Sequence, residues 1–183
     1  MLRNLGQSIV RAAGAGRNWT SSAVSAKVAQ LPVLRATGGT EVKAEEALAG
    51  KTVVVGVVGA FTGVCTSEHV PAYARAAEAL KAKGVDGVRV VSVNDHLVMD
   101  AWAESMGLAG EAGKAAGIEF LSDPDASFTS ALDLSIDLSG AGLGTRSQRY
   151  AMIVENGQVK DVFVETVPSE VSVSGVDHVL SKL

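Results

Sequence analysis

Cysteine is nearly absent from this sequence, with Cys65 as its single example in 183 residues. One cysteine excludes a disulfide within the chain and any CxxC metal site. Long apolar runs are absent too: none approaches the roughly 18 residues that a membrane-spanning helix requires, so we expect no membrane segment. Proline is scarce, with four residues against 20 glycines. Together with 47% hydrophobic and 20% charged residues, this composition is typical of a compact, soluble α/β domain.

Acidic residues are absent from the first 40 positions, which hold five of the 16 basic residues; the first acid is Glu41. A segment with arginine, many serines and alanines and no acid has the composition of an organelle transit peptide. We predict a transit peptide or disordered leader over residues 1–37 and one globular domain over residues 38–183. The stretch Arg17–Ser22 is similar to a mitochondrial presequence cleavage site, so a mitochondrial location is predicted, with the chloroplast as the alternative. The acidic domain offers no basic patch for nucleic acid.

Alternating strands and helices are predicted for the domain from its hydrophobic pattern. Runs of β-branched residues predict buried strands at Lys51–Gly59, Val88–Asp95 and Ile118–Asp123. Helical spacing predicts helices at Cys65–Lys83, His96–Gly107, Pro124–Leu134 and Ser174–Leu183. The Asn156-Gly157 dipeptide predicts a type I′ hairpin within Arg149–Glu165. This order is that of a thioredoxin-like fold: one α/β domain whose central mixed sheet has helices on both faces.

Three local features are predicted within these elements. Asp95 is expected to cap the helix that follows it. Pro71 is expected to kink the helix that begins at Cys65. Ser174 and Asp177 have the spacing of a capping box for the last helix.

Cys65 lies where chemistry is expected in such a fold. It follows a bend at residues 59–63 after the first buried strand, and reactive groups in open α/β sheets sit beyond the carboxyl ends of the strands. The start of a helix favours a thiolate through its unpaired N–H groups and the positive end of its dipole. A lone cysteine is usually an inert part of the core. The position of Cys65 and its polar neighbours Thr62, Thr66 and Ser67 favour a reactive cysteine instead.

Two arginines, Arg146 and Arg149, stand at the entry to the predicted hairpin. An arginine beside the thiol would stabilise the thiolate and polarise an anionic or oxygen-rich substrate. The glycine-rich stretch Leu138–Arg146 lacks the lysine and the serine or threonine that end a phosphate loop. We therefore expect a flexible loop there, beside the active site.

Several separate blocks of the sequence resemble the type II (atypical) peroxiredoxins, and most of all their plant-type mitochondrial branch. The blocks are GAFTGVCTSEHVPAY, VSVND, SDPDASF, LGTRSQRYAMIVENGQVK and PSEVSVSGVDHVL, which cover about residues 40–183 in order. In that family a T-x-x-C motif places a threonine hydroxyl beside the peroxidatic cysteine, and an arginine just before an aromatic residue completes the pocket. The resemblance therefore implies Cys65, Thr62 and Arg149 as the catalytic residues.

The resemblance implies a thiol-dependent peroxidase that reduces hydrogen peroxide and organic hydroperoxides. The Cys65 thiolate would attack one peroxide oxygen, while Arg149, Thr62 and the N–H groups at the helix start bind the peroxide and the developing charge. Cys65 would become a sulfenic acid, and neither a metal nor a bound cofactor is required. Family members often pair as noncovalent dimers, so a homodimer is expected as well.

Two positions depart from the family pattern. Val58 replaces the proline of the family sequence P-G-A-[FY]-T, which shields the thiol and shapes the loop. Val90 stands where the plant-type branch carries its resolving cysteine. Because the chain has no second thiol, we predict a one-cysteine cycle that is resolved by an external thiol. Glutathione with glutaredoxin is the first expected reductant, and thioredoxin is the alternative.

Three neighbouring residues, and the function itself, leave alternatives open. His69 shares the helix face of Cys65, as a structural or a catalytic group. Arg146 either assists at the pocket or pairs with surface acids, the second being favoured, and Glu68 either orients Arg149 or is solvated.

One rival function is a redox sensor on the same fold with slow Cys65 oxidation. The other is a Cys-His hydrolase with His69 as base, although a histidine at the i+4 position of a helix is poorly placed for that role.

Overall fold

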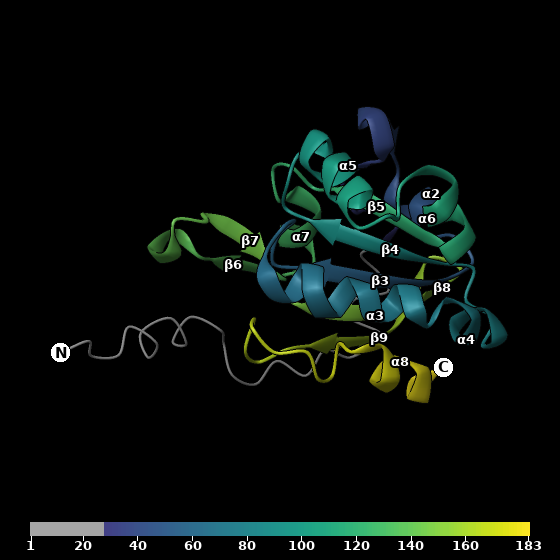
Figure 1. Cartoon of the computed structure of the whole chain (residues 1–183). Helices are drawn as coiled ribbons and strands as arrows, with labels where there is room; N and C mark the ends of the chain where they lie inside the picture. The colour runs from purple at the N-terminus through teal and green to yellow at the C-terminus, as the bar shows by residue number, and fades with distance from the viewer. Residues whose placement is uncertain (1–27) are drawn as a thin grey trace.

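Residues 28–183 are described by the computed structural model shown in Figure 1. Within them lies a seven-stranded mixed sheet in the order β2-β1-β5-β4-β3-β8-β9. Its strands are β1 (Leu34–Arg35), β2 (Glu41–Val42), β3 (Lys51–Val57), β4 (Gly87–Ser92), β5 (Ile118–Ser122), β8 (Tyr150–Glu155) and β9 (Gln158–Val164). The strands β3, β4 and β5 run parallel, and β8 and β9 continue the sheet antiparallel. Parallel strands place their carboxyl ends at one edge, and the segment that carries Cys65 starts there.

Helices cover both faces of the sheet, which confirms the predicted thioredoxin-like fold. They are α2 (Ala44–Ala47), α3 (Val70–Arg75), α4 (Ala77–Ala82), α5 (His96–Ser105), α6 (Gly110–Ala116), α7 (Ser127–Ala131) and α8 (Val176–Lys182). Side chains alternate along β3. Val53 and Val55 face a core shared with α3, α4, α5 and α8, whereas Val54 faces a second core shared with α2 and α7. Two cores on opposite faces of one sheet make a single domain.

The predicted strands and the hairpin are confirmed, because β3, β4, β5, β8 and β9 form where the sequence places them. Asn156 and Gly157 both have positive φ, +50° and +72°, as a type I′ turn requires. Asp95 caps α5 as predicted, since its Oδ1 accepts a hydrogen bond from Val98 N at 3.0 Å.

The capping box predicted at Ser174 and Asp177 is wrong. Gly175 is the N-cap residue of α8, and no side chain caps this helix. The Ser174 hydroxyl instead donates to Glu165 Oε1 at 2.8 Å. Because a carboxylate is charged, the bond that it accepts from this hydroxyl is stronger than a hydrogen bond between the hydroxyl and an uncharged backbone group at the start of the helix.

The long helix predicted from Cys65 to Lys83 consists of three segments: a π-helical turn η2 (Cys65–His69), then α3, then α4. Val70 N donates to Cys65 O, which spans one residue more than an α-helical bond. Pro71, which has no N–H to donate, stands in the first turn of α3, directly after η2. The predicted helix is therefore interrupted by a π-turn that ends two residues before the proline.

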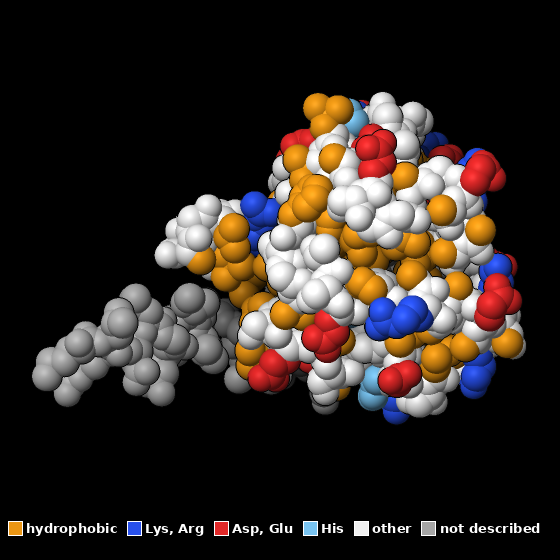
Figure 2. All heavy atoms as spheres, viewed as in Figure 1, with side chains coloured by type: hydrophobic (Ala, Val, Ile, Leu, Met, Phe, Trp, Pro, Cys, Tyr) orange, Lys and Arg blue, Asp and Glu red, His pale blue; other side chains and the backbone are white. Residues whose placement is uncertain are grey.

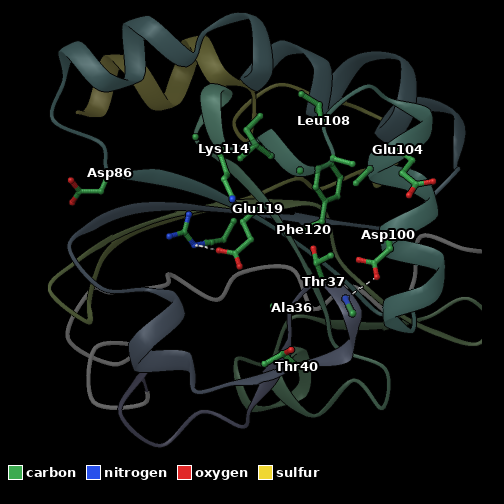
Figure 3. A pocket seen from close by; sticks show the side chains of 17 residues that line it. Ala36, Thr37, Thr40, Asp86, Asp100, Glu104, Leu108, Lys114, Glu119 and Phe120 are labelled. Carbon is green, nitrogen blue, oxygen red and sulfur yellow. Dashed lines mark hydrogen bonds and ion pairs between the residues drawn. The ribbon is translucent and has the colours of Figure 1, made fainter. Parts of the chain in front are cut away.

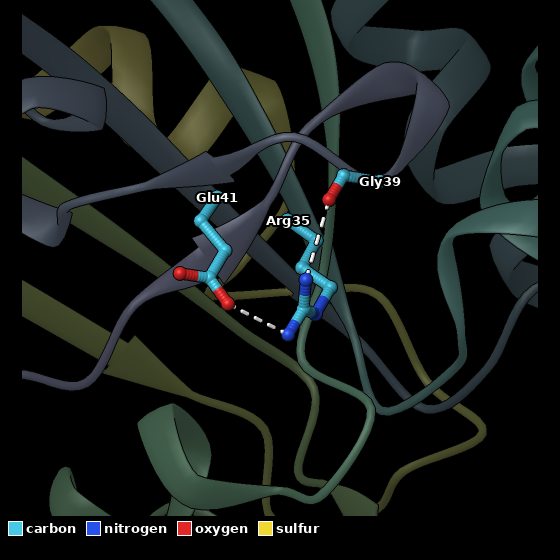
Figure 4. Close-up of polar contacts among 3 residues, drawn as sticks. All are labelled: Arg35, Gly39 and Glu41. Carbon is cyan, nitrogen blue, oxygen red and sulfur yellow. Dashed lines mark hydrogen bonds and ion pairs between the residues drawn. The ribbon is translucent and has the colours of Figure 1, made fainter.

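The N-terminal strands were not predicted. β1 pairs antiparallel with β2 and meets β5 at Ser122. Arg35 holds the turn between β1 and β2: its Nη2 pairs with Glu41 Oε1 at 2.8 Å, and its Nη1 donates to Gly39 O at 3.3 Å (Figure 4). Because this ion pair is exposed, it contributes on the order of 0–1 kcal/mol. It serves to align two very short strands.

Val28 and Leu34 are buried in the core on the α2 side. The packed chain thus includes residues upstream of position 38, where the sequence places the start of the domain. The predicted transit peptide before residue 28 lies outside the described residues. Within residues 28–183, no helix is long and apolar enough to cross a membrane.

The glycine-rich stretch Leu138–Arg146 was predicted as a flexible loop. It belongs to a two-stranded hairpin, β6 (Ser135–Asp137) and β7 (Thr145–Ser147), whose connection contains a short 3-10 turn, η3 (Ser139–Ala141). Figure 1 shows this hairpin projecting beyond the arrowheads of β3 and β4. It therefore stands at the same edge of the sheet as the turn that carries Cys65.

An open groove of about 920 Å³ lies between α5, α6, the edge of β5 and the turn at residues 36–40 (Figure 3). Asp100 Oδ2 accepts from Gly38 N at 2.9 Å, and Arg89 pairs with Glu119 at 3.2 Å. Neither Cys65 nor Arg149 lines this groove, so it is separate from the thiol. Charged side chains of both signs are scattered over the face shown in Figure 2.

Candidate active site

A tightly packed bend leads from β3 to the cysteine. A Cβ atom at Gly59 would stand 3.1 Å from Arg146 Nη1 and 3.2 Å from Thr62 Cγ2, so there is little room for a side chain at this position. Phe61 has φ +59°, in the left-handed region that is uncommon for a bulky residue, and its side chain is 54% exposed. Backbone strain of this kind gathers at functional sites. The bend sets the direction in which the following helix starts.

Cys65 stands in the first turn of that helix. Thr66 N donates to Thr62 O at 3.0 Å, so the N–H groups of residues 63–65 precede the first intrahelical bond and have no acceptor within the helix. Such groups, at the positive end of the helix dipole, stabilise an anion. The side chain of Cys65 therefore stands beside these N–H groups, at the positive end of the helix.

The thiol is buried. Cys65 has 0% exposure and belongs to the core on the α3 side, and its sulfur has no hydrogen-bond partner among residues 28–183. Thr62 Oγ1 donates to Gly59 O at 2.7 Å, which engages its hydrogen and leaves its oxygen free to accept. Trp102 Nε1 donates to Thr66 Oγ1 at 3.1 Å, so α5 packs against the cysteine turn. Because no part of Cys65 is exposed, a substrate reaches the sulfur only when the side chains that cover it move.

Arg149 is held by the helix that carries the thiol. It is 2% exposed, its Nη1 donates to His69 Nδ1 at 3.0 Å, and its Nε donates to Pro168 O at 2.9 Å. The structure thus brings Arg149 to the turn of Cys65 through His69. In the described part of the chain, no hydrogen bond joins the guanidinium directly to the Cys65 sulfur.

His69 is a structural, uncharged group. Arginine only donates, so His69 Nδ1 must accept; Nε2 then carries the proton and donates to Ser174 O at 3.0 Å. The pKa of His69 is lowered to about 4, chiefly by burial and also by the nearby Arg149 charge, against the opposing effects of the Ser174 bond and of Glu165. Both ring nitrogens are engaged, so His69 has no free site with which to deprotonate Cys65 as a hydrolase base.

Arg146 neither binds a surface acid, as favoured from the sequence, nor points at the thiol. Its Nε donates to Leu143 O at 2.8 Å, and its Nη1 donates to Val93 O at 3.2 Å and to Asn94 Oδ1 at 3.4 Å. Asn94 Oδ1 also accepts from Ala60 N at 3.0 Å. Arg146 therefore braces the cysteine bend through Asn94.

Glu68 is exposed, and no bond to Arg149 is formed, which favours the solvated alternative. Sequence reasoning gave Ser174 only the role of a helix cap and gave Tyr73 no role at the site. Tyr73 OH donates to the Ser174 carbonyl at 2.7 Å, beside the bond from His69. Asn94 could have been found, since it follows a buried strand at its carboxyl end. Among the described residues, no group of three or more His, Cys, Asp or Glu could hold a metal ion.

Comparison with known proteins agrees with this fold. Residues 22–180 match the Redoxin family. A crystal structure of reduced Prx3 in complex with H2O2 from Vibrio vulnificus superposes with a TM-score of 0.74 and 43% identity, covering 84% of this chain and 95% of that one. The chain belongs to the Redoxin family.

Curated relatives place the chain more narrowly. "Peroxiredoxin-2F, mitochondrial" of Oryza sativa subsp. japonica is 46% identical over 133 residues, and its Arabidopsis thaliana counterpart 44% over 133 residues. Each match covers 73% of this chain but only 64% and 63% of those relatives, so the chain spans just under two thirds of their length. Other relatives carry peroxisomal and chloroplastic names. The predicted resemblance to type II peroxiredoxins is confirmed.

Proposed function

We propose that this protein is a thiol-dependent peroxidase and that Cys65 is its peroxidatic residue. The Cys65 thiolate attacks one oxygen of a hydroperoxide; the O–O bond breaks, and the leaving oxygen departs as water or an alcohol after protonation. The sulfur is oxidised to a sulfenic acid while the peroxide is reduced. The observation that carries this proposal is the position of Cys65 in the first helical turn, at the carboxyl edge of the parallel strands, with a buried arginine anchored to the same helix.

Arg149 and Thr62 complete the proposed machinery. The free N–H groups of residues 63–65 and the Arg149 guanidinium supply positive potential for the leaving oxygen, where charge develops in the transition state. Thr62 Oγ1, whose own hydrogen is donated to Gly59 O, can accept a hydrogen bond from the O–H group of a hydroperoxide and so align its O–O bond with the sulfur. Because the thiol is buried, small peroxides are the substrates that reach it with the least rearrangement.

The proposed cycle uses one cysteine. With no second thiol in the chain, an external thiol must attack the sulfenic sulfur, forming a mixed disulfide and releasing water, and a second thiol then restores Cys65. Glutathione followed by glutaredoxin is the proposed reductant, with thioredoxin as the alternative. A noncovalent homodimer is part of the proposal: Phe61 and Leu97, 54% and 70% exposed, both follow the carboxyl ends of adjacent strands, where a second copy would cover them.

The proposed location is the mitochondrion, with residues before the domain as a cleaved leader. The names of the two plant relatives and the acid-free N-terminal composition favour it. Since Val28 and Leu34 are buried, cleavage at residue 37 would remove β1 and both of these core residues, so the proposed cleavage lies upstream of residue 28. N-terminal sequencing of the protein isolated from its organelle tests this.

Stopped-flow oxidation of the reduced protein tests the enzymatic proposal. The Trp102 indole donates a hydrogen bond to Thr66, the residue after Cys65. The fluorescence of Trp102 should therefore report oxidation of the sulfur. Fast, peroxide-dependent oxidation with turnover on added thiol is expected. Slow oxidation without turnover would favour the rival function, a redox sensor that signals through a partner.

A further inference from the structure

Glu165 is a buried acid that the proposed chemistry does not use. It follows β9 directly and is 7% exposed. Its Oε1 atom accepts three hydrogen bonds, from Ser172 N at 2.6 Å, Ser174 N at 2.8 Å and Ser174 Oγ at 2.8 Å. Its own N–H donates to Arg149 O at 2.9 Å. Glu165 thus joins the backbone of Arg149 to a segment that lies seven to nine residues further along the chain.

Ser174 passes this constraint to the cysteine helix. Its N–H and hydroxyl are both held by Glu165, so its carbonyl has a fixed direction. That carbonyl accepts from His69 Nε2 at 3.0 Å and from Tyr73 OH at 2.7 Å. An acceptor at this place selects the tautomer of His69 whose proton is on Nε2.

The tautomer in turn decides whether Arg149 Nη1 can donate to His69. Only the tautomer protonated on Nε2 presents a lone pair at Nδ1, which accepts from Arg149 Nη1 at 3.0 Å. The other acceptor of the guanidinium, Pro168 O, belongs to the same segment that Glu165 ties down. The contacts form a closed ring: Arg149 backbone, Glu165, Ser174, His69, Arg149 guanidinium. One cation and one anion are buried in this ring with a neutral imidazole between them, so the buried charges balance.

We propose that Glu165 is a positioning residue for Arg149, acting by fixing the Ser174 carbonyl and thereby the tautomer of His69. The functional consequence rests on the proposed peroxidase role of Arg149, whereas the effect on His69 does not. A residue that only tied down the loop would stabilise the fold without selecting a tautomer.

Two substitutions separate the acceptor position of Glu165 from its charge. Glu165→Asp keeps the charge but draws the oxygen back by one methylene, so the three donors lose it and Ser174 loosens. Glu165→Gln keeps an oxygen in place and removes the charge; it should lower the melting temperature, because the Arg149 charge then lacks its counter-charge, without releasing the Ser174 carbonyl. Glu170→Gln is the matched control, because Glu170 is exposed in the same loop. We expect Glu165→Asp to slow Cys65 oxidation by about 10- to 100-fold, the scale seen for groups that orient a reacting residue's partner, and Glu165→Gln to stay within about threefold of the unsubstituted protein.

The decisive readout is the ¹⁵N NMR signature of the His69 ring, measured on reduced, ¹⁵N-histidine-labelled protein without peroxide. The chain has only three histidines, and His69→Gln identifies the signal. We expect a protonated Nε2 and an unprotonated Nδ1 in the unsubstituted protein, in Glu165→Gln and in Glu170→Gln. In Glu165→Asp we expect an average over the two tautomers.

If Glu165→Asp keeps the fixed tautomer and the oxidation rate while only its melting temperature falls, the proposal is overturned. It is equally overturned if Glu165→Gln is as slow as Glu165→Asp with the tautomer intact. A protein that ignores peroxide but shows the expected tautomer shift would refute the peroxidase function and leave the positioning of Arg149 in place.

Discussion

Arg149 and His69 share a 3.0 Å hydrogen bond in which a buried guanidinium donates to an uncharged imidazole. The bond connects two residues 80 positions apart in the chain and attaches the arginine to the helix that starts with the thiol. Its existence requires that His69 stay neutral, since a protonated ring would repel the arginine and could not accept.

Replacing Cys65 by serine should abolish peroxide reduction, because a serine hydroxyl is not ionised at neutral pH and cannot be oxidised to a sulfenic acid. Serine is close to cysteine in size and leaves no cavity, although burying its hydroxyl in the core should lower the thermal midpoint somewhat. Peroxide consumption in the presence of a thiol donor measures this. Residual turnover above the rate without protein would mean that Cys65 is not the reacting group.

Replacing Arg149 by glutamine should slow Cys65 oxidation by about 10²- to 10³-fold, the usual effect of losing one preorganised donor to the developing charge. The matched variant Arg146→Gln should cost much less, because Arg146 contacts Asn94 and backbone carbonyls instead. Rates are compared by stopped-flow fluorescence. Should Arg149→Gln keep full activity while Arg146→Gln loses it, the roles assigned to the two arginines must be exchanged.

Acid should destabilise the protein through His69. Its pKa is about 4 in the fold, against about 6.5 in an unfolded chain. Between pH 6.5 and pH 4, His69 therefore binds a proton in the unfolded state but not in the folded state. The contribution of neutral His69 to the free energy of unfolding is complete above pH 6.5 and is lost as the pH falls towards 4. The free energy of unfolding should drop by about 1.4 kcal/mol per pH unit, about 3 kcal/mol in all.

Urea unfolding between pH 7 and pH 4.5 measures this slope. His69→Asn supplies the control, since asparagine keeps an acceptor near the Nδ1 position and does not titrate. Its dependence on pH should be shallower by the stated amount, since the two proteins share every other titratable group. Parallel slopes would contradict the buried, neutral state of His69.

Val58→Pro should speed Cys65 oxidation several-fold if valine loosens the bend above the thiol. The N–H of Val58 donates to no described residue, so proline removes no hydrogen bond. Val58→Ala is the control that changes side-chain size without fixing φ. Slower oxidation, or a lower melting temperature, would indicate that the bend has adopted a geometry specific to valine.

One equivalent of peroxide should give a persistent sulfenic acid on Cys65, and added glutathione should convert it to a single mixed disulfide. Excess peroxide should carry the sulfur on to the sulfinic acid, because no internal disulfide protects it. Intact-mass spectrometry distinguishes these species. A disulfide-linked dimer as the main oxidised form would show that Cys65 of a second chain acts as the resolving thiol.

The sheet and its large helices follow from the sequence because β3, β4 and β5 are runs of β-branched residues and α5 has both helical spacing and an Asp95 cap. β1, β2, α2 and α6 escaped prediction. The two strands have two residues each and α2 has four, too few for a period to show, whereas α6 contains two glycines and no large apolar residue, so tertiary packing decides it. Cys65 and Arg149 could be placed from position and resemblance. The partners of His69 could not, because one of them is a backbone carbonyl 105 residues away, and a carbonyl leaves no mark on the sequence.

The π-helical turn at Cys65–His69 changes the rotation of the side chains before it, around the helix axis, relative to the side chains of α3 that follow it. Val70 and Tyr73, after the turn, are fixed by the core, and they set the rotation of α3. The cysteine is offset from them by the extra residue that the wider turn contains. Loss of one residue between Cys65 and His69 would let α-helical bonding resume with α3 undisturbed, yet it would swing the sulfur about 100° around the helix axis. The direction of the thiol thus depends on the number of residues in this turn as well as on their identity. A chain with one residue fewer there could fold correctly and still point its sulfur away from Arg149.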